Sequence, residues 1–474
     1  MDARALLDRA PTAGLTGSVI KTTGMMAVVA GLPAPIGATV RIEREHGEGV
    51  EGEVVGFRNH ETMVSPFGSL AGVNRGASVR MTRGARSIPV GPGLLGRVVN
   101  AHGNTIDGRP RPEAGGRASV HQKPPTPMER PRIDRSLSTG IKAIDGLLTC
   151  GMGQRLGIFS AAGVGKSTLL GMMARYTQAD VNVICLTGER GREVGEFLQR
   201  DLGPTGLARS VVVVATSDEP PLMRLQAVSA ASAVAEHFRD QGKNVLLLVD
   251  SMTRVAQASR EIGLAAGEPP TTRGFPPSTF SLLPQIVERA GRNAHGSITA
   301  FYTVLVEGDD PNEPIADAMR GLLDGHLWLS RKLAAKGHYP AVDVVQSISR
   351  LMLELTELEQ QEAASHLRGL LAALEENDDL ISIGAYRTGT NPRVDAALAM
   401  RSRIDGFLRQ RIEESVEANE TLASLLELGK EASQWLEKSA SAAQPAASAS
   451  GLGSLQPPIT KQTAPAPEAP APAA

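Results

Sequence analysis

Residues 156–176 read LGIFSAAGVGKSTLLGMMARY, and they are the most informative part of the sequence. A short apolar run at 156–159 comes first, a glycine-bearing turn follows, and a helical pattern fills 169–176. A strand, a glycine loop and a helix in this order bind phosphate, because backbone N–H groups point into one concavity and the helix N-terminus adds positive potential. We therefore expect the turn to hold nucleotide phosphates through Ser160, Ala161, Ala162, Gly163, Val164, Gly165, Lys166, Ser167 and Thr168.

Two side chains of this turn carry specific chemistry. We expect the Lys166 ammonium to neutralise the β and γ phosphates of ATP, and the Ser167 hydroxyl to bind Mg²⁺. The turn departs from the usual pattern, since Ser160 stands where the first glycine is normally found. The alternative is a chance glycine turn, and the strand before it and the helix after it argue against that interpretation.

A second metal ligand is expected at the end of a neighbouring strand. Asp250 comes directly after the apolar run 245–249, which is the Walker B position. The alternative for Asp250 is an ordinary aspartate that caps the next helix. Its pairing with Lys166 in one sequence favours the metal site.

A charged cluster follows the apolar run 181–186. Parallel strands present their carboxyl ends at one edge, so Glu189 would face the γ-phosphate and orient the attacking water. We expect Arg190 beside it to hold a phosphate oxygen. The alternative is a solvated loop, and that is our interpretation of Glu193 and Glu196.

The remaining sequence divides by the rhythm of its apolar residues. Short alternating pieces broken by Gly and Pro predict a small barrel, and apolar runs alternating with helical patterns predict a parallel sheet buried on both faces. We expect an α/β fold, with a RecA-like P-loop core preceded by a small N-terminal β-barrel and followed by a helical C-terminal domain. The expected parts are an N-terminal extension (1–14), the barrel (15–98), a Pro-rich linker (99–135), the ATPase core (136–350), the helical domain (351–438) and a disordered tail (439–474).

One helix of the C-terminal domain is expected after Pro392. Leu398, Ile404, Leu408 and Ile412 recur among charged residues at spacings that fit one apolar face.

Composition excludes several classes of protein. The chain has 49 basic and 51 acidic side chains and only 3% aromatic residues, so neither a basic nucleic-acid-binding surface nor stacking platforms are indicated. Cys150 and Cys185 show no metal or disulfide spacing. No apolar run approaches the ~20 residues of a membrane span, so we expect a cytoplasmic protein.

Long motifs, rather than the short loop alone, relate this chain to known proteins. They are GERGREV (188–194), TSDEPPLM (216–223), REIGLAAGEPP (260–270) and ITAFYTVLVEGDDPNEP (298–314). With the phosphate loop, they resemble the rotary ATP synthase superfamily, and within it the flagellum-specific ATPases and their type III secretion relatives. The resemblance runs from about residue 14 to 428.

The resemblance implies roles that spacing alone does not. Glu189 matches the catalytic carboxylate, where the non-catalytic subunits of rotary synthases carry glutamine. Tyr339 is similar to the aromatic residue that packs on adenine, although a core tyrosine is the alternative. Arg350 is similar to the arginine finger that reaches a neighbouring subunit's nucleotide, although a surface ion pair is the alternative. A catalytic homohexamer follows from that finger.

The implied function is ATP hydrolysis, with ATP and Mg²⁺, by the export ATPase of the flagellar type III secretion apparatus. Such an enzyme releases chaperones from export substrates and helps unfold them. The implied partners are a negative regulator, a stalk protein, chaperone–substrate complexes and the membrane export gate, at the cytoplasmic face of the inner membrane. No nucleic-acid partner is expected.

Three alternatives remain at this stage. One is the ATPase of a virulence injectisome. Another is a structural ring subunit that holds nucleotide, which a neutral residue at position 189 or the loss of Lys166 would have favoured. The third is a rotary synthase subunit, and the run GEPP at 267–270 points away from it.

Overall fold

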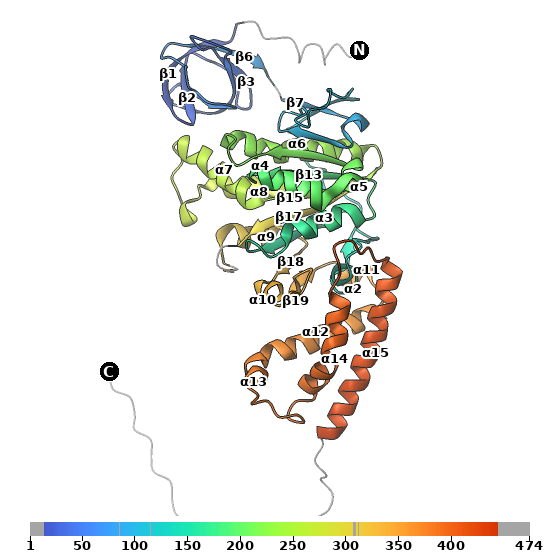
Figure 1. Cartoon of the computed structure of the whole chain (residues 1–474). Coiled ribbons are helices and arrows are strands. Elements are labelled where there is room, and N and C mark those ends of the chain that lie inside the picture. Colours follow the sequence, from blue (N-terminus) through green and yellow to red (C-terminus); the bar gives the residue numbers. More distant parts are fainter. Residues whose placement is uncertain (1–13, 85, 114, 307–309, 311, 444–474) are drawn as a thin grey trace, which may run out of the picture.

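The computed structural model describes residues 14–84, 86–113, 115–306, 310 and 312–443. Figure 1 shows a small barrel at one end of the molecule, a central sheet, and a bundle of helices at the other end. This confirms the expected fold class. The expected extension at 1–14 lies outside the described residues apart from Gly14. No helix among the described residues has the length and apolar character needed to cross a membrane.

The barrel is closed by six antiparallel strands in the order β1-β2-β5-β4-β3-β6, and β6 pairs back onto β1. Alternate residues point inward, and small apolar side chains such as Val29, Val40 and Val64 fill the interior. The strands are β1 (Thr16–Thr23), β2 (Met26–Ala30), β3 (Thr39–Ile42), β4 (Val50–Arg58), β5 (Glu61–Pro66) and β6 (Ser78–Arg83).

The barrel is shorter than the expected span of 15–98. β7 (Ser87–Val90) leaves it to pair with β9 (Gly116–Ser119), and β8 (Arg97–Asn100) joins the central sheet beside β14. The reason is burial on both faces, because Val98 packs in one apolar cluster of the core and Val99 in the other. The expected linker at 99–135 therefore contains strand β9 and the short helix η2 (Pro127–Glu129).

The central sheet has nine strands, in the order β19-β18-β12-β17-β15-β13-β14-β8, with β16 paired to β17. Three of these strands, β12, β13 and β15, lie where the apolar runs 156–159, 181–186 and 245–249 predicted them. All strands of the sheet are parallel except β16 and β19. The strands are β12 (Arg155–Ser160), β13 (Val181–Thr187), β14 (Ser210–Ala215), β15 (Asn244–Asp250), β16 (Gly291–Arg292), β17 (Ser297–Leu305), β18 (Gly325–Leu329) and β19 (Val342–Ser349).

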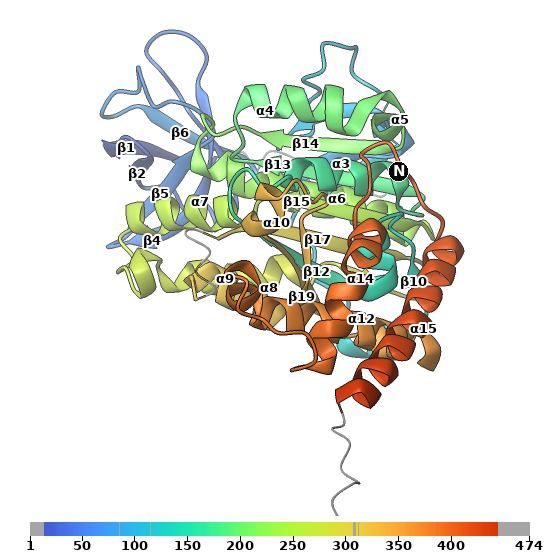
Figure 2. The same ribbon diagram turned by 60° about the horizontal axis from the view of Figure 1, so that its bottom comes forward.

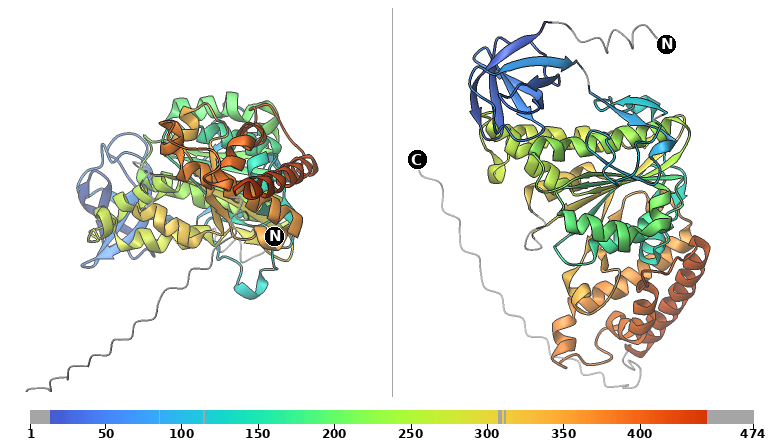
Figure 3. Two further views of the ribbon diagram at one scale, coloured as in Figure 1. Left: turned by 90° about the horizontal axis from the view of Figure 1, so that it is seen from below. Right: turned by 45° about the horizontal axis from the view of Figure 1, so that its top comes forward.

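Helices cover both faces of the sheet. Figure 3 shows α6 and α7 on the face toward the barrel, and α3 on the face toward the helical end. Ile158 and Phe159 illustrate the consequence, since these adjacent residues of β12 belong to different apolar clusters. The core helices are α2 (Lys142–Leu147), α3 (Lys166–Tyr176), α4 (Gly191–Glu196), η3 (Phe197–Leu202), α5 (Gly203–Ala208), α6 (Pro221–Asp240), α7 (Met252–Ala265), α8 (Pro277–Val287), α9 (Pro314–Leu322) and α10 (Arg331–Ala335).

The helical end begins after β19. In Figure 2, α12, α14 and α15 lie side by side, and they pack against one another and against α2. The helices are α11 (Met352–Leu355), α12 (Leu358–Glu376), α13 (Asp378–Ser382), α14 (Pro392–Leu408) and α15 (Ala418–Ala443). Because α15 continues to Ala443, the prediction of disorder from residue 439 is wrong for 439–443, and the rest of that segment lies outside the described residues.

The apolar face of α14 differs from the prediction. Ile404 and Leu408 are buried as predicted, together with Val394 and Met400, whereas Leu398 is only half-buried and Ile412 is exposed beyond the end of the helix. The helix packs against both α12 and α15, and its buried face follows those two neighbours.

Candidate nucleotide site

The predicted site residues come from strands whose carboxyl ends share one edge of the sheet. β12 ends at Ser160 and leads into the phosphate loop, and β15 ends at Asp250. β13 ends at Thr187, directly before Gly188 and Glu189. The parallel register aligns these ends, and ligands bind at such an edge in open α/β sheets.

Lys166, Asp250 and Glu189 converge at this edge. The Lys166 ammonium forms an ion pair with Asp250 Oδ1, and it lies 3.5 Å from Glu189 Oε1. Their side chains are 13%, 5% and 17% exposed respectively. Burial disfavours the charge on Lys166, but the fields of Asp250 and then Glu189 outweigh it and raise the Lys166 pKa. The structure thus brings together the three side chains that the sequence predicted.

The phosphate loop depends on glycines with left-handed backbone angles. Gly163 has φ 79° and Gly165 has φ 89°, a region that other residues adopt at a cost. Gly165 immediately precedes α3, and a Cβ atom there would lie 3.3 Å from the ring of Tyr339. Tyr339 therefore lies directly against the loop.

Ser160 stands at the end of β12, in the position of the usual first glycine, and its role in binding phosphate stays a prediction. Its side chain is buried, and within the described part of the chain no group hydrogen bonds to its Oγ. Its carbonyl accepts a hydrogen bond of 2.9 Å from the Val306 N–H, which fixes the end of β12. Ala161 and Val164 are also buried and support the loop, whereas Ala162 is exposed on it.

Ser167 and Thr168 lie in the first turn of α3 and are half-buried. They stand beside Lys166 at the helix N-terminus, where an anion is favoured. Thr303, which the sequence analysis missed, donates a hydrogen bond of 2.7 Å from Oγ1 to Asp250 Oδ1. This bond orients the Asp250 carboxylate.

Glu189 is a carboxyl group with a perturbed acidity. Burial, the negative charge of Asp250 and a hydrogen bond to Glu193 raise its pKa to about 7, against the opposing field of Lys166. The same hydrogen bond lowers the pKa of Glu193, so the proton of this carboxyl pair resides on Glu189. Glu193 is thus a partly solvated residue, 39% exposed and 3.3 Å from Arg190, that also contacts Glu189. Glu196 fits the interpretation of a solvated residue, since it is exposed and lies 3.6 Å from Arg192.

Arg190 lies at the rim of the site. Its side chain is 81% exposed, and Nη1 lies 3.3 Å from Glu193 Oε1. A role for Arg190 in holding phosphate stays a prediction.

Arg254 is a further residue that the sequence analysis missed. It is the third residue of α7, which follows Asp250, and a Cβ atom on Gly188 would lie 2.7 Å from the Arg254 Cβ. Gly188 has φ 73°, so its lack of a side chain allows both the turn and this contact. Arg254 Nη1 donates to Gln257 at 3.1 Å. The sequence did offer one signal for Arg254, which is its position about one helical turn after Asp250 at the end of the Walker B strand.

Tyr339 and Arg350 flank β19 and lie at opposite edges of the sheet. β19 is antiparallel to β18, with Val342 opposite Leu329 and Ser349 opposite Gly325. It therefore starts at the phosphate-loop edge and ends at the other, about 23 Å away at strand spacing. Tyr339 joins the predicted site, and Arg350 does not belong to the site of its own chain.

Comparisons with known proteins agree with this architecture. The family described as "ATP synthase alpha/beta family, nucleotide-binding domain" matches residues 140–349, and its beta-barrel domain matches 16–83. The T3SS EscN ATPase C-terminal domain matches 356–427.

Individual relatives match most of the chain. The flagellum-specific ATP synthase of Bacillus subtilis is 49% identical over 414 residues, which cover 87% of this chain and 94% of the relative. The type 3 secretion system ATPase of Xanthomonas euvesicatoria is 49% identical, covering 83% and 89%. A solved structure of the assembled ATPase EscN with its central stalk EscO, from enteropathogenic E. coli, aligns with a TM-score of 0.80 at 42% identity, covering 87% of this chain and 100% of that one. The chain therefore belongs to the ATP synthase alpha/beta family, within the branch of flagellum-specific and type III secretion ATPases.

Proposed function

We propose that this chain is the ATPase of a flagellar type III export apparatus and that it hydrolyses ATP together with Mg²⁺. The observation that carries this proposal is the convergence of Lys166, Asp250 and Glu189 at one strand edge beside the phosphate loop. A subunit that only held nucleotide would not need a buried carboxyl group with a pKa near neutrality at this position.

Lys166 and the loop bind the triphosphate. In the structure the ammonium pairs with two carboxylates, and a triphosphate offers it a stronger anionic partner. Turning toward the phosphates would release both carboxylates. Tyr339 then packs against the base, since its ring already lies against Gly165.

Asp250 and Ser167 suit a magnesium ion. Mg²⁺ takes oxygen ligands and is commonly held by one or two protein groups together with substrate phosphates. The ammonium seated on Asp250 shows that this carboxylate accommodates a cation. Among the described residues no group of three or more His, Cys, Asp or Glu could hold a metal by itself, which fits a metal that arrives with its nucleotide. When bound, the metal supplies charge neutralisation on the phosphates.

Glu189 orients and deprotonates the attacking water. This requires the ionised carboxylate, and a pKa near 7 leaves the group able both to accept and to return a proton at neutral pH. The bond to Glu193 gives the proton a second oxygen to share.

Arg350 acts on the nucleotide of a neighbouring subunit in a homohexamer. Its place at the far edge of the sheet keeps it from the site of its own chain, and the guanidinium there is exposed. An arginine supplied in this way stabilises charge in the transition state and is worth ~10³ to 10⁵ in rate in well-studied NTPases. The solved assembly of the relative EscN supports a ring.

The helical end suits contacts with other proteins of the apparatus. Leu380 and Ile383, on and just after α13, are exposed apolar side chains at the end remote from the barrel. We assign this end to a stalk protein, like the stalk of EscN, and to chaperone–substrate complexes. The assembly would work at the cytoplasmic face of the inner membrane, against the export gate and under a negative regulator.

Two experiments test the proposal. Purified protein should release phosphate from ATP in a Mg²⁺-dependent manner, and near-wild-type turnover by Glu189→Gln would overturn the catalytic assignment. Deleting the gene in its host should abolish flagellar filaments, and only a gene encoding an intact Glu189 should restore them. Normal filaments with lost secretion of effector proteins would instead assign the chain to an injectisome.

A further inference from the structure

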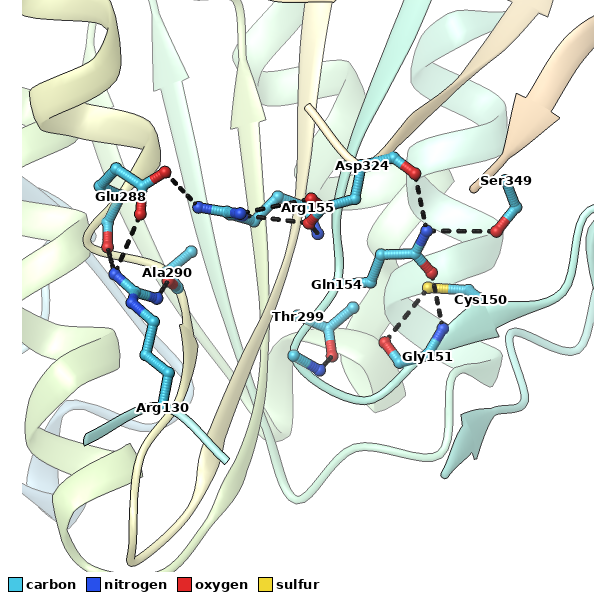
Figure 4. A network of polar contacts seen from close by, with 11 residues as sticks. Arg130, Cys150, Gly151, Gln154, Arg155, Glu288, Ala290, Thr299, Asp324 and Ser349 are labelled. Carbon is cyan, nitrogen blue, oxygen red and sulfur yellow. Dashed lines mark hydrogen bonds and ion pairs between the residues drawn. The ribbon is translucent and has the colours of Figure 1, made fainter. Parts of the chain in front are cut away.

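The sheet edge opposite the phosphate loop carries a buried polar network (Figure 4). Arg350 belongs to this edge through its backbone, because its N–H donates to the Asp324 carbonyl at 3.0 Å. Its Nη2 donates to the Arg320 carbonyl at 3.3 Å. A Cβ atom on Gly325 would lie 2.3 Å from the Ile348 carbonyl oxygen, so β18 and β19 approach each other closely here.

Gln154 lies at the centre of the network. Its side chain is 0% exposed, and Nε2 donates to the Asp324 carbonyl at 3.0 Å and to Ser349 Oγ at 3.1 Å. Its Oε1 accepts from the Gly151 N–H at 2.8 Å. Ser349 Oγ in turn donates to the Thr149 carbonyl at 2.7 Å. One buried amide thus binds both neighbours of Arg350: the carbonyl that accepts from its N–H and the side chain of the preceding residue.

Arg155 supports the same strand end from the other side. Its N–H and Nε each donate to Asp324 Oδ2 at 3.1 Å, and Nη1 donates to Glu288 Oε1 at 2.6 Å. Arg130 contacts the other oxygen of Glu288 at 3.1 Å and the Ala290 carbonyl at 2.9 Å. Two sets of contacts therefore fix the Asp324 carbonyl: those of the Asp324 side chain with Arg155, and the hydrogen bond from Gln154.

We propose that Gln154 is a positioning residue for Arg350, acting through the Asp324 carbonyl and the Ser349 hydroxyl. The proposal rests on the role of Arg350 given above. The side chain at position 154 must accept a hydrogen bond from one N–H group and donate hydrogen bonds to two oxygen atoms. Only an amide side chain meets this requirement. Gln154 directly precedes β12, whose other end is the phosphate loop, so one strand connects a subunit's own site with the arginine that it lends to its neighbour.

Rings assembled from two different variants separate the role of a subunit's own ATP site from the role of the Arg350 that it supplies to its neighbour. A Lys166→Ala subunit lacks a working site and keeps its arginine, whereas an Arg350→Ala subunit keeps its site and lacks the arginine. Each alone should be nearly inactive. A random 1:1 mixture should recover about a quarter of wild-type phosphate release, because a quarter of the interfaces pair an intact site with an intact arginine.

Gln154→Met is then introduced either into the Lys166→Ala subunit or into the Arg350→Ala subunit, and the mixing experiment is repeated. In the Lys166→Ala subunit it should reduce the recovered activity about tenfold or more, because small misplacements of a catalytic group cost that much. In the Arg350→Ala subunit, which has no arginine to place, it should leave most of the recovery intact. A purely structural role would not distinguish the two subunits.

Asn182→Leu is the matched control. Asn182 is also a fully buried amide at the start of a core strand, and its Nδ2 donates to the Ala174 carbonyl at 2.7 Å and to Ser210 Oγ at 3.3 Å. In the Lys166→Ala subunit it should preserve the recovery. Ser349→Ala, a milder change to the same network, carries the test if Gln154→Met fails to fold.

Full recovery by the Lys166→Ala, Gln154→Met subunit would overturn the positioning role. An equal loss from either subunit would do the same. If the unmodified pair recovers no activity, the reach of Arg350 across the interface is refuted and this inference with it, whereas ATP hydrolysis by the wild type stands separately.

Discussion

The carboxyl pair of Glu189 and Glu193 gives the enzyme a characteristic pH profile. The pKa of Glu189 is raised from 4.5 to about 7, and the ionised form orients the water, so activity should rise with pH through about 7. This rise should appear in kcat/KM, the parameter that reports the pKa values of the free enzyme. We therefore expect kcat/KM at pH 6 to be about tenfold below its plateau, because only about a tenth of the carboxyl is then ionised.

Glu193→Gln should shift the rise in kcat/KM to lower pH. Both the hydrogen bond from Glu189 to Glu193 and the negative charge of Glu193 raise the Glu189 pKa, and the substitution removes the charge and the strong acceptor. The variant should thus retain a larger fraction of its own plateau at pH 6 than the wild type does. The plateau value of kcat/KM should fall far less below that of the wild type in Glu193→Gln than in Glu189→Gln.

The assay is steady-state phosphate release at low ATP between pH 5.5 and 8.5. Glu196→Gln is the control, since it removes a carboxylate from the same helix that pairs with Arg192. Titration of the nucleotide itself is common to all three proteins and cancels in the comparison. The shared-proton argument would be refuted by a wild-type kcat/KM that does not change with pH. It would also be refuted if kcat/KM of Glu193→Gln rose over the same pH range as that of the wild type.

Three further predictions concern the phosphate loop, Arg350 and the barrel. Lys166→Ala and Glu189→Gln should each lower phosphate release at least about 10²-fold, as loss of a group that stabilises the transition state does. Arg350→Ala should lower turnover about 10³-fold or more while ATP binding, measured by calorimetry, stays within about threefold; an equal loss of both would contradict the role in trans. Glu53, buried in the barrel beside Gln226 of α6, has a pKa raised by burial from 4.5 to about 7, so the folded state loses stability as pH rises through this window. Glu53→Gln should therefore raise the free energy of unfolding in urea by up to about 3 kcal/mol at pH 8 and little at pH 5, and equal effects at both would count against it.

Local signals sufficed for much of the architecture. The glycine loop, the apolar runs and Asp250 follow from residues adjacent in sequence, and the structure brings Lys166, Asp250 and Glu189 together as predicted. The parallel topology explains this success, because any residue at the carboxyl end of a core strand reaches the same edge.

Other features of the structure depend on partners that are distant in sequence. β8 pairs with β14 more than a hundred residues later, and no pattern within 97–100 indicates which sheet it joins. The buried face of α14 is set by α12 and α15, not by the spacing of its own leucines. Gln154 is a single polar residue before a strand, and its importance arises only when residues 324 and 349 come beside it.

The closure of the N-terminal barrel has a consequence for assembly. An open sheet offers unpaired N–H and C=O groups that recruit another chain by strand addition, which is hard to reverse and invites aggregation. Here β6 returns to β1, so the ladder is complete within each polypeptide. Neighbouring barrels would therefore meet through side chains and loops instead of by strand addition, and such contacts allow protomers to join and separate without unravelling a strand.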